Sequence, residues 1–279
     1  MFEPSPTKTC RICFGHGFKL IAKGEHAHAT ICSCVPICSL CQGRGIRSIE
    51  KNGVRRTGRC RCQKLPDRIH IFNLAQIPAI HGKNCFETFR HLTTGATLAA
   101  KSCNSWMQQF DQKTRKGLIL TGPVGRGKTH LLIAILRSLI FQKGIRVRFI
   151  EFSRLLSILR DGYSKGDSNQ ELLTELSTVP VLAIDELGKG RLTDWELSII
   201  DEVISRRYNT KGLIIATTNY KWGPPQHKGA TLTNLSENFH TQTLGDRVGD
   251  RVFSRLQESC FFAPVQGEDF RARRVQKIL

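Results

Sequence analysis

The residues best suited to chemistry form a glycine-rich loop in the middle of the chain. The segment from Gly122 to Thr129 reads GPVGRGKT and matches the pattern G-x-x-x-x-G-K-[ST]. This pattern is typical of loops whose backbone N–H groups face a phosphate, with the lysine reaching the β- and γ-phosphate oxygens and the Ser or Thr binding Mg2+. We therefore expect ATP and Mg2+ here, and the expected nucleotide ligands are Gly122, Pro123, Val124, Gly125, Arg126, Gly127, Lys128, Thr129, His130 and Asp185.

Two further apolar segments end in polar residues that suit the same chemistry. Residues 179–186 read VPVLAIDE, which predicts a buried strand that ends in Asp185 and Glu186. Asp185 is expected to hold the Mg2+ water shell and Glu186 to polarise an attacking water, which predicts a hydrolase rather than a pure nucleotide binder. Residues 212–219 end in Asn219, which we expect to orient water against the γ-phosphate. The expected catalytic residues are Glu186, Lys128, Asn219 and Arg255.

Arg255 belongs to a series of arginines at intervals of four, with Arg247 and Arg251. On one continuous helix these three side chains share a face. Two interpretations stay open, a solvated basic face or an arginine finger that reaches the ATP of a neighbouring subunit.

Eight of the 11 cysteines precede residue 63 and form an internal repeat. Each unit reads C-x2-C-x-G-x-G, then 14 residues, then C-x-C, and the second unit repeats the first at a spacing of 28 residues. Four thiolates per unit suit the tetrahedral coordination of Zn2+. The second unit carries Asn52-Gly53, a strong hairpin signal, and a hairpin would return each C-x-C pair to its C-x2-C pair.

We therefore expect two Zn2+ sites, each closed within one unit. The expected ligands are Cys10, Cys13, Cys32 and Cys34 in the first unit and Cys38, Cys41, Cys60 and Cys62 in the second. Cross-bracing between the units is the alternative pairing, and His26 and His28 are possible competing ligands. An iron–sulfur cluster or disulfides are the alternative interpretations of the cysteine pattern. The glycine-bearing units resemble the cysteine repeats of the DnaJ chaperone zinc region.

The elements that would position these residues suggest three parts. Residues 1–64 form the double zinc module, 65–116 a linker followed by a helix over 94–112, and 117–279 a nucleotide-binding α/β domain. In that domain we expect a strand at 117–121, a helix at 130–142, a helix at 194–208 with a capping box of Thr193 and Glu196, and a last strand at 260–265.

The combined motifs resemble AAA+ ATPases of the DnaC/DnaI helicase-loader group, close to the IstB transposition helpers. The segments that carry the resemblance are GPVGRGKTHL, VLAIDELG, TDWELSIIDEVISRRYN, IIATTNY and DRVGDRVFSRL, and it extends over about residues 70–272. The resemblance implies a five-stranded parallel sheet flanked by helices, and it places the arginine finger at Arg255, with Arg251 next. Only 14 residues follow Val265, which is too few for the helical lid of other AAA+ proteins.

The resemblance also implies a function and partners. It predicts an ATP-dependent replicative helicase loader in DNA replication, with single-stranded DNA binding, ATP-dependent homo-oligomers and a zinc module that docks on the helicase. The alternative is an IstB-like ATPase that regulates transposition by binding DNA, and a third reading is a zinc-binding module with an inactive ATPase.

Charge and hydropathy limit the setting. The chain has 42 Lys+Arg against 23 Asp+Glu, a formal charge of +19, which favours a polyanionic partner. Eight zinc-bound thiolates and two Zn2+ ions would lower this charge to about +15. Apolar runs fall far short of the roughly 20 residues that span a bilayer, and the N-terminus has no apolar signal region, so we expect a cytoplasmic protein with no membrane partner.

Overall fold

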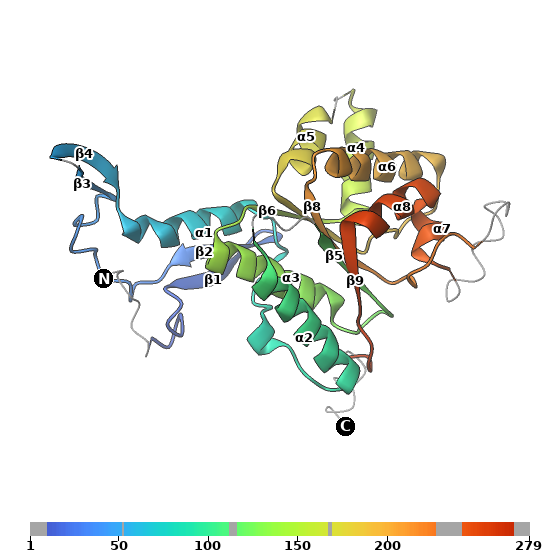
Figure 1. Cartoon of the computed structure of the whole chain (residues 1–279), viewed down its shortest axis with the longest axis horizontal. Helices are drawn as coiled ribbons and strands as arrows, with labels where there is room; N and C mark the ends of the chain where they lie inside the picture. Colours follow the sequence, from blue (N-terminus) through green and yellow to red (C-terminus); the bar gives the residue numbers. More distant parts are fainter. Residues whose placement is uncertain (1–9, 52, 112–115, 167–168, 227–241, 271–279) are drawn as a thin grey trace. The chain divides into compact units, whose positions relative to one another are not determined.

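The chain consists of two compact units (Figure 1). The computed structural model describes residues 10–51, 53–111, 116–166, 169–226 and 242–270. The first unit comprises residues up to 83 together with 140–144, and the second comprises 84–139 and the rest of the chain from 145. No helix in the described residues is both long and apolar enough to cross a membrane.

The first unit is built on two antiparallel hairpins, one from each cysteine repeat. The first pairs β1 (Phe18–Lys23) with β2 (His26–Ile31), and the second pairs β3 (Ile46–Lys51) with β4 (Val54–Arg59). Each hairpin carries the C-x2-C and C-x-C pairs at its open end, as the repeat predicts. The small β-hairpin region with cysteine clusters is thereby confirmed.

A helix follows where we expected a linker. A short 3-10 turn (Arg61–Gln63) leads into α1 (Lys64–Leu74), so the prediction of a linker from residue 65 is wrong for this stretch. Pro66 is compatible with the helix because it lies in the first turn, where backbone N–H groups have no intrahelical partner. The side chain of Asn73 accepts a hydrogen bond from the Ala29 N–H at 2.7 Å and donates to the Ala29 carbonyl at 3.1 Å, which ties α1 to β2.

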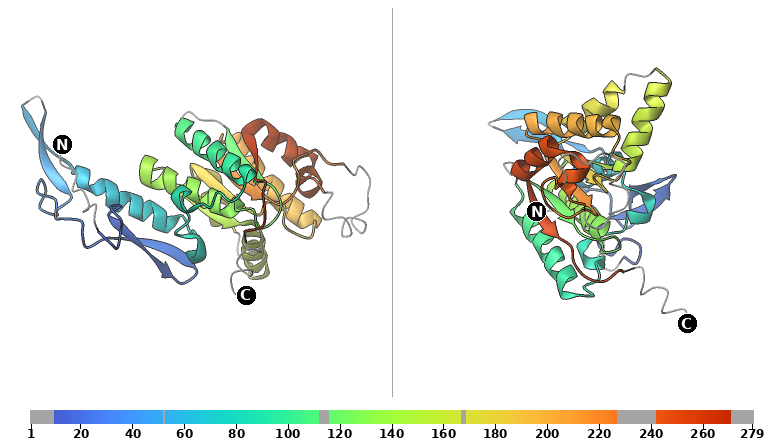
Figure 2. Two further views of the ribbon diagram at one scale, coloured as in Figure 1. Left: turned by 90° about the horizontal axis from the view of Figure 1, so that it is seen from below. Right: turned by 90° about the vertical axis from the view of Figure 1, so that its right-hand side faces the viewer.

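The hairpins differ in their surroundings. Strand β2 runs along α1, and after α1 the chain returns to it, where Ala27 N–H donates to the Ile77 carbonyl at 2.8 Å near a 3-10 turn (Ala79–His81). Hairpin β3–β4 lies beyond the first turn of α1 (Figure 2), and its strand residues are almost all exposed. The first hairpin is therefore packed in the unit, whereas the second is surrounded by solvent.

The second unit is a five-stranded, all-parallel sheet with strand order β6-β7-β8-β5-β9. The strands are β5 (Gly117–Thr121), β6 (Val147–Glu151), β7 (Val181–Asp185), β8 (Leu213–Thr218) and β9 (Cys260–Pro264). Strands β5, β7 and β8 are buried at every position, as expected for central strands with helices on both faces. The predicted α/β fold with five parallel strands is confirmed.

Helices cover both faces of this sheet (Figure 1). One face carries α2 (Thr94–Gln109) and α3 (Lys128–Ser138), and the other carries α4, α5, α6, α7 and α8. Their bounds are α4 Phe152–Ser164, α5 Gln170–Thr178, α6 Asp194–Asn209, α7 Leu244–Val248 and α8 Asp250–Ser259, with a 3-10 turn at Phe86–Thr88 before α2. On the second face, alternate strand residues such as Leu182, Ile184 and Ile214 form one core with these helices.

Two helix ends depart from expectation. The helix predicted over 130–142 ends as α3 at Ser138 and continues as a π-helical turn, Leu139–Lys143. Residues 140–144 belong to the first unit, where the Phe141 ring stacks on Phe18 at a centroid distance of 4.0 Å. At α6, Thr193 accepts from the Glu196 N–H as predicted, but the Glu196 carboxylate accepts from the N–H of Arg191 at 2.7 Å. The second half of the capping box is therefore wrong.

Candidate functional site

The glycine-rich loop connects β5 to α3, the strand–loop–helix context that a phosphate-binding loop requires. Gly127 caps α3 in the left-handed region at φ 86°, and a Cβ there would lie 2.8 Å from the Phe89 ring. A Cβ on Gly122 would lie 2.3 Å from the Val265 carbonyl oxygen. Both positions therefore need glycine. Lys128 is buried at the start of α3, and its Nζ donates to the Pro123 carbonyl at 2.7 Å, which holds the ammonium group over the loop.

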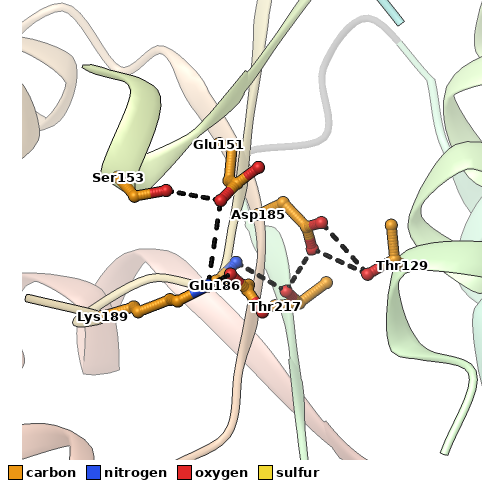
Figure 3. Close-up of polar contacts among 7 residues, drawn as sticks. All are labelled: Thr129, Glu151, Ser153, Asp185, Glu186, Lys189 and Thr217. Carbon is orange, nitrogen blue, oxygen red and sulfur yellow. Dashed lines mark hydrogen bonds and ion pairs between the residues drawn. The ribbon is translucent and has the colours of Figure 1, made fainter. Parts of the chain in front are cut away.

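The Thr129 hydroxyl lies beside the carboxylate at the end of β7 (Figure 3). Its Oγ1 donates to Asp185 at 3.1 Å and 3.0 Å from the two carboxylate oxygens, and Thr217 of β8 donates to Asp185 Oδ1 at 2.5 Å. Burial raises the pKa of Asp185 above its ordinary value, although the two threonine hydroxyls oppose this shift. A buried carboxylate beside a hydroxyl offers the hard oxygen ligands that Mg2+ prefers, so these residues fit the expected metal.

The Glu186 carboxylate pairs with a neighbouring lysine, whereas the backbone of Glu186 bonds to a threonine. The backbone of Glu186 adopts a left-handed φ of 57°, and the Glu186 N–H donates to the Thr217 hydroxyl at 2.9 Å. Its carboxylate forms an ion pair with Lys189, whose Nζ also lies 3.9 Å from Glu151 at the end of β6 (Figure 3). The pKa of Lys189 is raised by its hydrogen bond to Glu186. The site thus contains a carboxylate suited to general-base chemistry, and this carboxylate is ion-paired with a lysine.

The structure places the other predicted ligands around the glycine-rich loop and the end of β8. The His130 ring faces the segment before α2, with Nε2 at 2.9 Å from the Cys85 carbonyl oxygen and the ring edge-on to Phe89. Val124 is 52% exposed at the loop tip. Asn219 lies one residue beyond the end of β8, and within the described residues no hydrogen bond joins it to Asp185 or Glu186. The remaining loop residues, Pro123, Gly125 and Arg126, lie between β5 and α3 as the motif requires.

The three arginines do not share one helix face. Gly249, at φ 81°, breaks the helix into α7 and α8, so the prediction is wrong for Arg247. The Arg247 guanidinium is buried, with Nε donating to the Gly188 carbonyl at 3.0 Å and the charge over the Tyr220 ring. On α8, the Arg255 side chain is 20% exposed and paired with Asp201 of α6 at 2.8 Å, whereas Arg251 is 73% exposed and 3.6 Å from Asp201.

The eight N-terminal cysteines form two groups in the first unit, each drawn from one repeat. The groups are Cys10, Cys13, Cys32 and Cys34, and Cys38, Cys41, Cys60 and Cys62, with all sulfur atoms of a group within 4.8 Å of one another. This arrangement is the within-unit closure we expected rather than cross-bracing. Neither group includes a histidine of the described chain.

The sulfur spacing fits a single metal ion. Sulfur pairs in the two groups lie 3.3–3.8 Å apart. Tetrahedral Zn2+ with Zn–S bonds of about 2.3 Å requires sulfurs about 3.8 Å apart, whereas a disulfide requires about 2.0 Å. Burial raises the pKa of the Cys41 thiol, but the Gly45 N–H and the neighbouring thiols outweigh it and bring this pKa to about 7. With this sulfur spacing, each group could hold one metal ion.

Sequence reasoning missed several residues of the nucleotide site. Thr217 contacts both Asp185 and Glu186, and Lys189 forms ion pairs with both Glu186 and Glu151. The polar ends of β6 and β8 were a usable signal, because the carboxyl ends of parallel strands meet at one edge of the sheet. The segment after β9 also contacts the loop, since Phe270 N–H donates to the Gly125 carbonyl at 3.0 Å.

Comparisons with known proteins agree with this geometry. The family model of the IstB-like ATP binding protein matches residues 67–277. The replicative helicase loader DnaC of Escherichia coli (strain K12) is 30% identical over 182 residues, which is 65% of this chain and 67% of the relative. The crystal structure of the DnaC helicase loader covers 67% of this chain and 99% of its own, with a TM-score of 0.55 and 27% identity. The crystal structure of DnaI, at 20% identity and a TM-score of 0.50, shares the fold.

Proposed function

Because the chain belongs to the family of IstB-like ATP-binding proteins, AAA+ P-loop ATPases, we propose that it is an ATP-dependent loader of a replicative DNA helicase. The observation that carries this proposal is the 30% identity to a replicative helicase loader over 182 residues. The family match over residues 67–277 includes Lys128, Thr129, Asp185 and Glu186. These side chains come from the glycine-rich loop and from the end of β7, so one bound nucleotide can contact all of them.

In this proposal each residue has one role at the ATP site. Lys128 neutralises the β- and γ-phosphates, Thr129 and Asp185 hold Mg2+, and Glu186 accepts a proton from the attacking water while Asn219 orients that water. The ion, when bound, would supply positive charge to the phosphate oxygens. A neighbouring subunit would supply the arginine finger in an ATP-dependent homo-oligomer. Arg251 is already exposed for that role, whereas Arg255 first has to leave Asp201.

Lys189 is expected to restrain the general base. Replacing Lys189 by Met removes the cation that pairs with Glu186, so the carboxylate is free to turn toward water. A partly exposed ion pair is worth about 0.2–1 kcal/mol, so steady-state ATP turnover should rise by up to about five-fold. Phosphate release by the full chain at saturating Mg-ATP measures this change.

The matched control is Lys189→Arg, which keeps the charge and should leave turnover near that of the wild type. Turnover that falls in Lys189→Met, with Lys189→Arg unchanged, would show that the cation assists Glu186 instead of restraining it.

The partner assignments extend to the first unit. We assign two Zn2+ ions to the cysteine groups, helicase docking to the first repeat, and single-stranded DNA to the ATPase unit. Docking on a protein favours exposed apolar side chains, and the first repeat exposes Ile12 (59%) and Phe14 (76%) beside its metal-binding sulfurs. The second repeat has the polar Gln42 at the position of Phe14.

The loader proposal is tested by binding of the full zinc-loaded chain to the cognate replicative helicase. Phe14→Gln should weaken this binding by at least about 30-fold, because an aromatic anchor in an interface contributes about 2 kcal/mol or more. The substitution suits the backbone, since Phe14 and Gln42 both have φ 50°. Isothermal titration or a quantitative pull-down measures the affinity.

Ile80→Gln serves as the control, because Ile80 is 83% exposed in the same unit but lies outside both cysteine repeats. Equal affinity of both variants and the wild type would remove the docking role of the first repeat. Failure of the wild-type chain to bind helicase in the presence of ATP would overturn the loader proposal.

A further inference from the structure

The second cysteine repeat carries far more positive charge than the first. Between Cys38 and Cys62 the chain has seven Lys and Arg residues and one Glu, whereas the equivalent stretch from Cys10 to Cys34 has three and one. Four thiolates and one Zn2+ subtract two charges from each unit. The metal-loaded first repeat is therefore about neutral, and the second retains a charge of about +4.

The added charge lies on the hairpin that solvent surrounds. Arg55 and Arg56 are neighbours on β4, so their side chains point to opposite faces of the two-stranded ribbon, and both are exposed. The equivalent residues of the first repeat are Ala27, which is buried, and His28, which is half-buried. Strand β2 of the first repeat thus packs against other elements, whereas the equivalent strand β4 of the second repeat presents arginines to solvent.

Most of these arginines form no ion pair within the described residues, although Glu50 lies opposite Arg55 in the hairpin register. Of the arginines from Arg44 to Arg61, only Arg59 forms an ion pair among the described residues, with Asp67. Arg47 lies on the same face of the ribbon as Arg56. Residues 47 and 49 share one face of β3, because side chains alternate along a strand, and Ile49 lies opposite Arg56. Cations on both faces of a protruding ribbon repel one another unless they meet anions, so the arrangement favours an external polyanion.

The hairpin's composition distinguishes between kinds of nucleic acid. Residues 46–59 contain no Phe, Tyr, Trp or His. Proteins that bind single strands stack the bases on aromatic side chains, which this hairpin does not offer. A two-stranded β-ribbon fits the major groove of a duplex, about 12 Å wide, where arginines on its two faces can reach phosphates on both sides. We propose that the β3–β4 hairpin is a sequence-independent duplex-DNA-binding element that contacts phosphates through Arg47, Arg55 and Arg56.

The test uses the full zinc-loaded chain and a fluorescent 20-base-pair duplex of arbitrary sequence. Arg55→Ser combined with Arg56→Ser should weaken duplex binding by at least ten-fold at 0.1 M salt. Each phosphate contact adds about 0.9 to the slope of log K against log salt, so the slope should fall by about 1.8. Fluorescence anisotropy from about 50 to 200 mM salt gives both quantities, and two Zn2+ per chain in the variant would show that its metal sites are intact.

The control removes the same charge from the other repeat, because Lys19→Ser combined with Lys23→Ser changes two exposed cations of the first hairpin. This control should keep duplex affinity within about two-fold of the wild type. Three outcomes would overturn the proposal. The first is an equal loss of duplex affinity in both double variants, and the second is a loss seen only with the single strand of the same sequence. The third is full displacement of the duplex by an equal charge concentration of polyglutamate. No helicase is present, so this outcome is independent of the loader proposal.

Discussion

Replacing Glu186 by Gln is expected to reduce ATP turnover by about 100- to 10,000-fold while ATP binding remains. The substitution keeps the shape of the side chain and its compatibility with the left-handed backbone at this residue, but it removes the oxygen that accepts a proton. A positioned general base contributes about this factor to hydrolysis. Phosphate release at saturating Mg-ATP should therefore collapse, and titration with a fluorescent ATP analogue should give an unchanged dissociation constant.

Glu151→Gln is the matched control for this prediction. Glu151 is also a carboxylate at the end of a parallel strand, and it also lies near Lys189. It is not adjacent to Asp185 in the chain, and its carboxylate accepts a hydrogen bond from the Ser153 hydroxyl. We expect turnover to change by less than about three-fold. If Glu151→Gln lost as much activity as Glu186→Gln, the base would have to be assigned to the pair of carboxylates, and if Glu186→Gln kept full activity, the assignment to Glu186 would fall.

Local sequence signals were sufficient for the elements that build the phosphate-binding loop. The apolar run from Gly117 to Thr121 and the glycine motif after it specify a strand, a turn and a helix start within about a dozen residues. The strand that ends in Asp185 was predictable for the same reason, because its apolar residues and its acid are contiguous. The two cysteine groups were also predictable, since a repeat of eight ligands leaves few geometries that satisfy tetrahedral zinc.

Contacts between distant segments were not accessible in this way. Thr217 becomes a partner of Asp185 only because β8 lies next to β7, and sheet order depends on the packing of the whole unit. Lys189 meets Glu151 for the same reason. The break between α7 and α8 did leave a sequence signal, since Gly249 interrupts the helical pattern between Arg247 and Arg251. The four-residue spacing of the arginines nevertheless favoured the prediction of one continuous helix. Helix α1 was missed because Pro66 suggests a linker unless it is placed in a first turn.

Loss of metal from the second cysteine group is expected to unfold the β3–β4 hairpin completely. The buried apolar cluster of this repeat consists of Cys38, Cys41 and Cys60, with Cys62 packed against it, so the ligands themselves are its core. An isolated two-stranded hairpin is marginally stable in water, and structural Zn2+ contributes about 10–16 kcal/mol in small zinc-binding peptides. Cys60→Ser should therefore lower the metal content from two Zn2+ per chain to one and abolish hydrogen-exchange protection throughout β3 and β4.

The equivalent change in the first repeat, Cys32→Ser, is the matched control and should have a smaller structural effect. Strand β2 keeps the buried Ala27 and Ala29 and the two hydrogen bonds between Ala29 and Asn73 of α1, which do not depend on the metal. Its amides should thus retain part of their protection although one Zn2+ is lost. In both variants ATP binding should persist, because the ATP site lies in the other unit. Two Zn2+ per chain in Cys60→Ser, or equal loss of protection in both hairpins, would show that the hairpins do not differ in their dependence on metal.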